Sequence, residues 1–206
     1  MSKVQSNAAP LAVRELCSRP QRTAPCHAVP PWKIIADVNL YFVTTTIVHW
    51  QSVSTSPPYF QILVKSLKHC VEKKGLHLHG YVIMPTHAHY ILSTDHGINL
   101  SNVMRDFNTH TSREITALLK RDQRISMLRV FQTAALEDGR GNNFKVWQTG
   151  FHPIYIVSDK FFWEKLDYIH YNPVRKGLVR RPEQWQYSSA RNYILDDHTI
   201  IEVEFL

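Results

Sequence analysis

Two strand-like segments that meet at a proline constrain the fold of this chain more than any other feature. Residues 76–84 and 87–93 are rich in apolar and aromatic side chains, a composition that is typical of strands. Pro85 cannot donate a hydrogen bond to a ladder, so the break falls at Pro85 and Thr86. We therefore predict an antiparallel hairpin over these two segments.

Helical periodicity flanks this hairpin on both sides. Residues 57–73 and 100–120 carry apolar side chains at helical spacing, and further strand-like runs lie at 41–48 and 154–157. The order β-α-β-β-α-β is that of the ferredoxin-like split βαβ arrangement. We predict an α+β fold with one antiparallel sheet and both crossover helices on one face, which leaves the other face open for a site.

The remaining segments divide the chain into three parts. Residues 1–37 are rich in proline and predict an extended or poorly ordered arm. The main domain spans 38–194, and within it residues 121–146 predict a long loop or insertion with at most one short helix. A third helix starts at Ser158 and Asp159 and is expected to end before Pro173. Residues 187–194 are helical or irregular, and the tail 195–206 includes a candidate strand at 199–205.

Composition narrows the class of partner. The formal net charge is +7 and the pI about 9.4, which favours a polyanion, with nucleic acid as the first candidate. No apolar run reaches the length of a membrane span, and the N-terminus lacks the pattern of a signal peptide. The three cysteines are widely spaced without a CxxC pair, so neither a disulfide framework nor a cysteine zinc site is expected. We expect a cytoplasmic protein without a membrane partner.

Histidine pairs are the first candidates for chemistry. His87 and His89 alternate on a predicted strand, so both imidazoles face the same side. Two neutral imidazoles can hold a divalent metal and leave coordination positions for water and substrate. Two surface histidines would give the same pattern. His77 and His79 form a rival pair on the neighbouring strand, and spacing alone does not choose between the pairs.

The third helix offers a nucleophile. Tyr168 and Asn172 are four residues apart and share one flank of the helix. A phenol beside an amide at this spacing could present a nucleophile and a metal ligand together. A tyrosine that packs at the helix edge, with an asparagine near the helix end, is equally compatible with the spacing.

Four motifs, in order between about residues 40 and 193, resemble those of a known family. The run MPTHAH at 84–89 resembles the MPxHxH signature of the HUH transposases. The run YIHYNPVRKGLV at 168–179 resembles the YIxxNPVxxGLV block of the REP-associated tyrosine transposases, relatives of the small single-strand transposases of insertion sequences (transposase IS200-like domain). WQTGF at 147–151 and WQYSS at 185–189 are similar to that family's WQxxF and WxxSS segments.

The resemblance implies an activity. It implies metal-dependent cleavage and strand transfer of single-stranded DNA at hairpin-forming repeats, with Tyr168 as nucleophile through a 5′-phosphotyrosine intermediate. It assigns His87, His89 and Asn172 as ligands of Mg²⁺ or Mn²⁺. It leaves both His77 and His79 outside the motif. Insertion-sequence relatives are dimers that exchange their tyrosine helices, so a homodimer is one arrangement that the resemblance allows.

Basic residues after the nucleophile's helix are the expected DNA contacts. Four of them are predicted to hold backbone phosphates: Arg175, Lys176, Arg180 and Arg181. Trp185 and Tyr187 are candidates for stacking on unpaired bases. Two alternatives stay open at this point: a domesticated DNA-binding protein with little nuclease activity, and a metal-dependent hydrolase that uses water.

Overall fold

A four-stranded antiparallel sheet forms the centre of the molecule. The computed structural model describes residues 39–206, so the predicted arm at 1–37 lies outside the described residues. The strands are β1 (Tyr41–Thr46), β2 (Leu76–Ile83), β3 (His87–Thr94) and β4 (Ile154–Tyr155), in the order β2-β3-β1-β4. Each neighbouring pair is antiparallel. This is the predicted ferredoxin-like order, and it places β3, which carries the histidine pair, between two strands.

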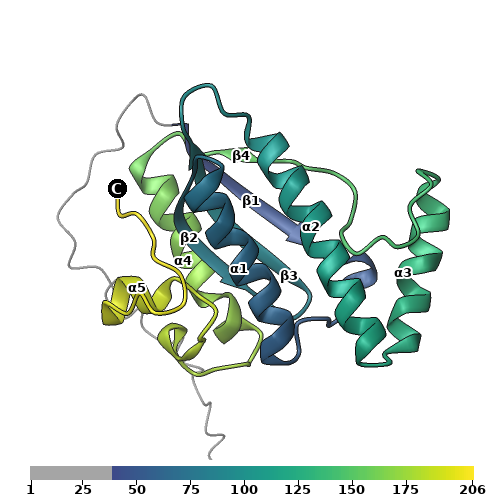
Figure 1. The fold of residues 1–206 in the computed structure, drawn as a ribbon. Coiled ribbons are helices and arrows are strands. Elements are labelled where there is room, and N and C mark those ends of the chain that lie inside the picture. Colours follow the sequence, from purple (N-terminus) through teal and green to yellow (C-terminus); the bar gives the residue numbers. More distant parts are fainter. Residues whose placement is uncertain (1–38) are drawn as a thin grey trace, which may run out of the picture.

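Two helices cover one face of the sheet (Figure 1). They are α1 (Pro57–Lys73) and α2 (Leu100–Arg121), close to the predicted bounds. The apolar stripe of each helix faces the sheet, and residues such as Leu67, Tyr90 and Phe107 are almost fully buried between the layers. Burial of each such side chain stabilises the fold by roughly 1.5–3 kcal/mol.

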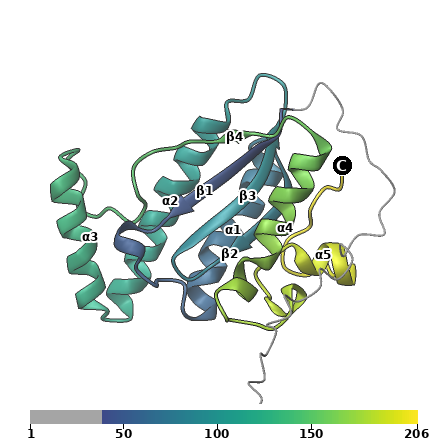
Figure 2. The same ribbon diagram turned by 180° about the vertical axis from the view of Figure 1, so that it is seen from behind.

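On the opposite face of the sheet, α4 (Asp159–Arg175) packs against β2 and β3 and leaves much of β1 uncovered, as Figure 2 shows. The face that we predicted to be open is therefore open only in part, because the apolar stripe Phe162, Leu166 and Ile169 must itself be buried. These side chains form a second core with residues of the sheet that include Phe42. Gly80 lets the helix approach closely, since a Cβ at this position would lie 2.7 Å from Cδ1 of Leu166.

The helix α4 also continues through Pro173, where we expected it to end. Ser158 caps its start, as predicted, by accepting a hydrogen bond from the Phe161 N–H. Pro173 has no N–H to donate within the helix, but it lies only two residues before the helix ends at Arg175, so the disturbance is confined to the last turn. As a result, Asn172 remains helical and stays one turn from Tyr168 on the same flank.

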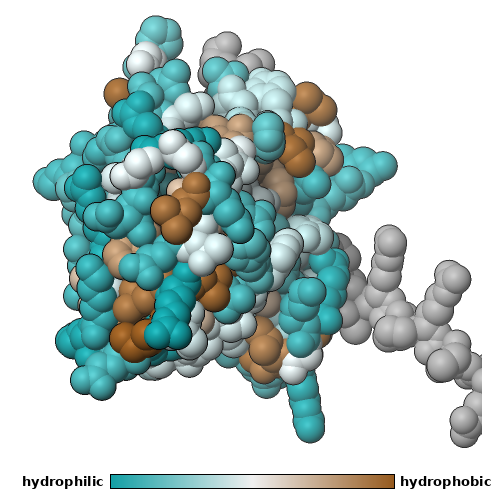
Figure 3. Space-filling view, turned by 90° about the vertical axis from the view of Figure 1, so that its right-hand side faces the viewer, coloured by the Kyte–Doolittle hydropathy of each residue, from teal (hydrophilic) through white to brown (hydrophobic). Residues whose placement is uncertain are grey.

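The segment 121–146 is more regular than the predicted loop. It contains α3 (Ile125–Asp138), a 14-residue helix that packs beside α2. Its buried residues recur at helical spacing: Met127, Leu128, Phe131, Ala134 and Ala135. The side of the molecule on which α3 lies is largely hydrophilic with scattered hydrophobic residues (Figure 3).

The C-terminal segments support the sheet without extending it. Residues 182–184 form a short 3-10 helix, and α5 (Ala190–Leu195) is a six-residue helix. The candidate strand at 199–205 is absent, because the segment makes only one backbone hydrogen bond with β2, from Glu204 N–H to Leu78 O. Its apolar side chains Ile201 and Val203 are nevertheless buried in the main core. None of the helices in residues 39–206 is both long and apolar enough to cross a membrane.

Candidate active site

The two histidines of the HxH motif lie side by side on the sheet face that α4 covers. His87 and His89 are each 6% exposed, and their ring centroids are 4.8 Å apart. Ala88 between them points into the opposite core and is fully buried. The predicted common face is therefore observed, but the pair is buried rather than displayed on an open surface.

Each imidazole is held by a threonine through its Nδ1 atom. Thr44 Oγ1 lies 2.8 Å from His89 Nδ1, and Thr86 Oγ1 lies 2.9 Å from His87 Nδ1. When a hydroxyl accepts from Nδ1–H, the lone pair of the ring resides on Nε2, which is the tautomer that a metal ligand needs. The threonines thus fix the rings in an orientation suited to coordination through Nε2.

Burial keeps this pair neutral. Desolvation lowers the pKa of His89 to about 3, and the neighbouring charges of His87 and Lys165 act in the same direction. Desolvation also lowers the pKa of His87, assisted by the charge of Lys176 and opposed by the nearby side chain of Asn172. Neutral imidazoles at pH 7 can bind a cation without first releasing a proton.

Tyr168 reaches the histidines from α4. Its ring centroid is 5.2 Å from that of His89 and 6.0 Å from that of Phe42. The side chain is 40% exposed, so a substrate can approach its hydroxyl. The guanidinium of Arg175 lies 5.2 Å from the ring centroid. In this structure the tyrosine and both histidines of the site come from the same chain.

Asn172 completes a donor set that fits a divalent cation. Its side chain is 5% exposed, interacts with His87, and leaves Oδ1 buried without a hydrogen-bond partner. An orphaned buried amide oxygen is costly unless a ligand occupies it. Within residues 39–206, no group of three or more His, Cys, Asp or Glu side chains is arranged to hold a metal. A metal at this site would therefore need the asparagine oxygen, with water and substrate in the other positions.

The four basic residues that we predicted to contact DNA are all exposed. Two of them lie beside the Tyr168 and His87 side chains. Arg175 contacts the Tyr168 ring, and Lys176 is close enough to lower the pKa of His87. Arg180 and Arg181 follow on the next segment, where Arg181 forms an ion pair of 3.1 Å with Glu183. Arg175 and Lys176 are thus adjacent to the site.

The rival histidine pair has a structural role. His77 lies between two carboxylates, with Nδ1 2.8 Å from Glu204 and Nε2 2.8 Å from Asp95, and these contacts raise its pKa. His79 is buried, and its Nε2 lies 2.8 Å from the Ser93 hydroxyl. Both imidazoles therefore tie the C-terminal tail or β3 to β2.

The aromatic residues of the WxxSS segment also pack inside the protein. Tyr187 is buried and stacks on Phe60 at a centroid distance of 4.0 Å, so the prediction that it stacks on DNA bases is wrong. The Trp185 indole N–H donates to Ile83 O at 3.0 Å. Ser189 connects this segment to α4, because its hydroxyl lies 2.9 Å from His170 Nε2.

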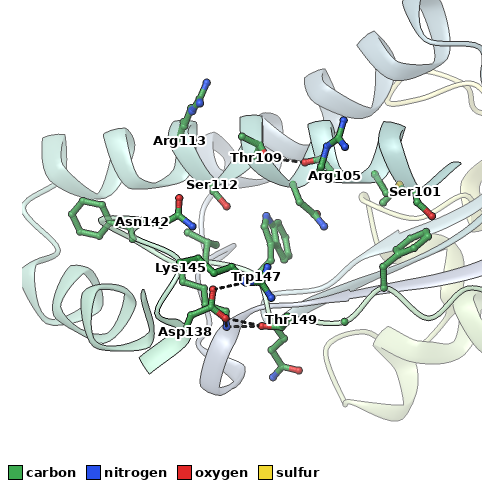
Figure 4. Close-up of a pocket in the computed structure, with 18 residues that line it drawn as sticks. Ser101, Arg105, Thr109, Ser112, Arg113, Asp138, Asn142, Lys145, Trp147 and Thr149 are labelled. Carbon is green, nitrogen blue, oxygen red and sulfur yellow. Dashed lines mark hydrogen bonds and ion pairs between the residues drawn. The ribbon is translucent and has the colours of Figure 1, made fainter. Parts of the chain in front are cut away.

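A cavity of about 460 Å³ lies between α2 and residues 138–151 (Figure 4), and neither the histidines nor Tyr168 line it. Arg105 and Arg113 lie on its α2 side, and the Lys145 ammonium is bound to Asp138 at 2.6 Å. Trp147 of the WQxxF segment donates its indole N–H to Thr111 at 3.0 Å. This tryptophan is therefore a packing residue that joins the segment to α2.

Comparisons with known proteins bear on the predicted resemblance. Residues 42–132 match the family model described as transposase IS200 like. The predicted resemblance is confirmed. The matched region holds both histidines and Thr44 but ends before Tyr168.

Two relatives extend the comparison beyond that region. The chain is 25% identical over 156 residues to a REP-associated tyrosine transposase of Haemophilus influenzae, which covers 73% of this chain and 79% of the relative. A solved REP-associated tyrosine transposase bound to a REP hairpin has a TM-score of 0.56. At 17% identity, over 87% of this chain and 91% of that one, this likeness concerns the fold.

Thr44 is the residue of this site that sequence reasoning missed. It stands 45 residues before His89, and only the pairing of β1 with β3 sets the two opposite each other. A threonine in a strand is common, so no local signal distinguishes this one. Thr86, by contrast, occupies the variable position of the MPxHxH motif, where its contact with the next residue is local.

Proposed function

We propose that this protein cleaves and rejoins single-stranded DNA with Tyr168 as the nucleophile, on DNA that forms hairpins. One observation carries the proposal: the Tyr168 ring lies 5.2 Å from His89, on a helix that comes from a distant part of the sequence. A phenol and two neutral imidazoles on facing elements provide a nucleophile and a cation site for one phosphodiester.

The cation is proposed to be Mg²⁺ or Mn²⁺, held by His87, His89 and the amide oxygen of Asn172. When bound, such an ion polarises the scissile phosphate and neutralises charge in the transition state. The protein's own part is to keep both imidazoles neutral and oriented, which the threonine hydrogen bonds and burial support. The buried and unpartnered Asn172 oxygen supports the third position.

The proposed reaction proceeds in two balanced steps. The Tyr168 oxygen attacks phosphorus, the bond from phosphorus to the 3′ oxygen breaks, and the phenol proton passes to solvent while the 3′ oxygen gains one. The product is a 5′-phosphotyrosine and a free 3′-hydroxyl. In the reverse sense, a 3′-hydroxyl attacks the adduct and Tyr168 leaves as a phenolate, which is a better leaving group than an alkoxide. The phosphotyrosine bond conserves the energy, so the steps need no nucleotide cofactor.

Positive charge beside the nucleophile would hold the phosphate that is attacked. Arg175 lies against the Tyr168 ring, and Lys176 acts on His87. Both side chains are exposed, so DNA can reach them, and they can offset the charge of a backbone phosphate. We propose that Arg180 and Arg181 contact the DNA farther from the cleaved bond.

A covalent-adduct assay tests this function. End-labelled single-stranded hairpins from the DNA that flanks the gene would be incubated with Mn²⁺ or Mg²⁺ and run on a denaturing gel. We expect a labelled protein band that requires metal and disappears with Tyr168→Phe. Tyr155→Phe is the matched control, because Tyr155 is 45% exposed and Tyr168 is 40% exposed. The Tyr155 variant should form the adduct at the wild-type rate.

The other outcomes distinguish the alternatives. Cleavage without an adduct that survives Tyr168→Phe would mean a nuclease that uses water and would overturn the proposal. Tight binding of several hairpins without any cleavage would favour a domesticated DNA-binding protein.

A further inference from the structure

An exposed tryptophan stands at the edge of the candidate active site. Trp50 is 58% exposed, and its ring centroid lies 5.6 Å from that of His87. Trp147, for comparison, is 7% exposed. Tryptophan buries more apolar area than almost any other side chain, so an exposed one beside a catalytic site suggests a ligand that covers it.

The backbone that presents this tryptophan is strained. His49 and Trp50 both have φ of 53°, the left-handed region that L-residues with a Cβ seldom occupy. Such a residue persists only where the surrounding structure holds it. Two in succession, neither of them glycine, indicate that this turn is kept for the position of its side chains.

The surrounding contacts hold the turn firmly. Val48 N–H donates to Val146 O at 2.9 Å, and Trp50 N–H donates to Ile47 O at 3.0 Å. On the other side, Val53 N–H donates to Pro85 O at 3.1 Å. The turn is thus anchored to the segment that contains WQxxF and to the proline of the MPxHxH motif.

Four aromatic rings form a continuous series of contacts across the site. Tyr168 contacts His89 at 5.2 Å, His89 contacts His87 at 4.8 Å, and His87 contacts Trp50 at 5.6 Å. A phosphate placed at the two histidines would have the nucleophile on one side and the indole on the other. The base of a nucleotide next to that phosphate is the group that would lie over Trp50.

We propose that Trp50 forms a nucleobase-binding subsite, on which one unpaired base next to the cleaved phosphodiester stacks. The subsite rests on the proposed function, because it needs single-stranded DNA at the histidines. A base is free to stack on an indole only when it is not already stacked in a duplex, so the subsite favours an unpaired strand. The fixed turn orders the indole before DNA binds, which lowers the entropic cost of stacking.

The test measures binding of uncut DNA by proteins that all carry Tyr168→Phe. The DNA is a hairpin with a single-stranded tail through the mapped cleavage position, together with copies in which one tail base at a time is replaced by an abasic site. Stacking on an aromatic residue contributes about 1–3 kcal/mol per base, so Trp50→Ala should weaken binding of the intact tail by roughly fivefold to 150-fold. Trp50→Phe, which keeps a ring, should recover most of this loss.

The abasic series separates stacking from a general loss of shape. At one tail position, the abasic DNA should bind the protein that keeps Trp50 and the Trp50→Ala variant equally weakly. The reason is that removing the base and removing the indole eliminate the same contact. If the loss caused by Trp50→Ala is the same at every abasic position, or if no loss occurs, the subsite is wrong. Tyr155→Ala, a change at another exposed aromatic residue, should leave the affinity unchanged.

Two further readouts keep the result interpretable. Trp50→Gly should unfold at a higher denaturant concentration than Trp50→Ala, because glycine relieves the positive φ. Wild-type adduct formation reports on the proposed function separately. An adduct without any stacking signature would overturn the subsite alone, whereas a wild-type protein that neither binds nor cleaves any hairpin would overturn both.

Discussion

Replacing Thr44 by valine tests how the histidines are prepared for a metal. The substitution is nearly isosteric and removes only the hydroxyl that lies 2.8 Å from His89 Nδ1. Valine is at least as favourable as threonine in a strand. The side chain of Thr44 is exposed, so water can replace part of the lost hydrogen bond. We therefore expect the free energy of unfolding to fall by only about 0.5–1.5 kcal/mol.

The effect on metal affinity should be larger. Loss of the partner of a ligating histidine typically weakens metal binding by about 10- to 100-fold, which corresponds to roughly 1.4–2.7 kcal/mol. Without the hydroxyl, His89 loses the hydrogen bond that favours a proton on Nδ1 and can adopt the tautomer that carries its proton on Nε2. That tautomer cannot coordinate a cation through Nε2.

The assay is a titration of metal-free protein with Mn²⁺, followed by electron paramagnetic resonance of the free ion. Thr46→Val is the matched control, since Thr46 lies two residues along β1 on the same face and pairs with His87 in the strand register. The control should bind Mn²⁺ like the wild type. Equal affinity for Thr44→Val and wild type, or equal losses in both variants, would refute the reasoning. If the wild type binds no Mn²⁺ at all, the proposed metal site itself is wrong.

Two further predictions concern the scaffold around the site. Gly80→Ala should lower the free energy of unfolding by about 1–3 kcal/mol, as measured by urea denaturation, because the new Cβ would lie 2.7 Å from Leu166 Cδ1; an unchanged urea midpoint would mean that α4 shifts freely. The second prediction concerns the pH dependence of stability. Glu204 and Asp95 raise the pKa of His77 in the folded protein. The stabilisation that protonated His77 gives the fold is therefore fully present below the pKa of the unfolded chain, near 6.5, and is lost as pH rises through the folded pKa. The stability difference between wild type and His77→Gln should therefore shrink as pH rises above about 6.5, and a difference that stays constant from about pH 6 to pH 8 would contradict it.

Local patterns predicted most of the secondary structure correctly. The hairpin around Pro85 and the helices at 57–73 and 100–120 depend on side-chain periodicity and turn chemistry, which neighbouring residues determine. The helix α3 was missed because its charged flanks and small buried alanines obscured an apolar stripe that was present in the sequence. The end of α4 was misplaced because the helix, whose apolar stripe packs on the sheet, continues for two residues past Pro173 although proline donates no hydrogen bond.

Sequence patterns also identified most of the residues of the candidate site, but not their contacts. The HxH pattern and the resemblance of the YIHYN segment identified His87, His89, Tyr168 and Asn172 as candidates, although they could not show that these residues meet. Their meeting requires α4 to fold back across the sheet, a placement that depends on Gly80 and on the second core.

The sequence by itself determined the order of strands and helices, the residue types available for chemistry and the likeness to a transposase family. Only the tertiary structure decided which residues orient the histidines, how close the tyrosine lies, and that an exposed tryptophan stands beside them. The physical reason is the sequence separation of the interacting residues, because helix and strand patterns are set by residues only a few positions apart. The contact of Thr44 with His89 spans 45 residues and depends on strand order, and that of His89 with Tyr168 depends on how two layers pack.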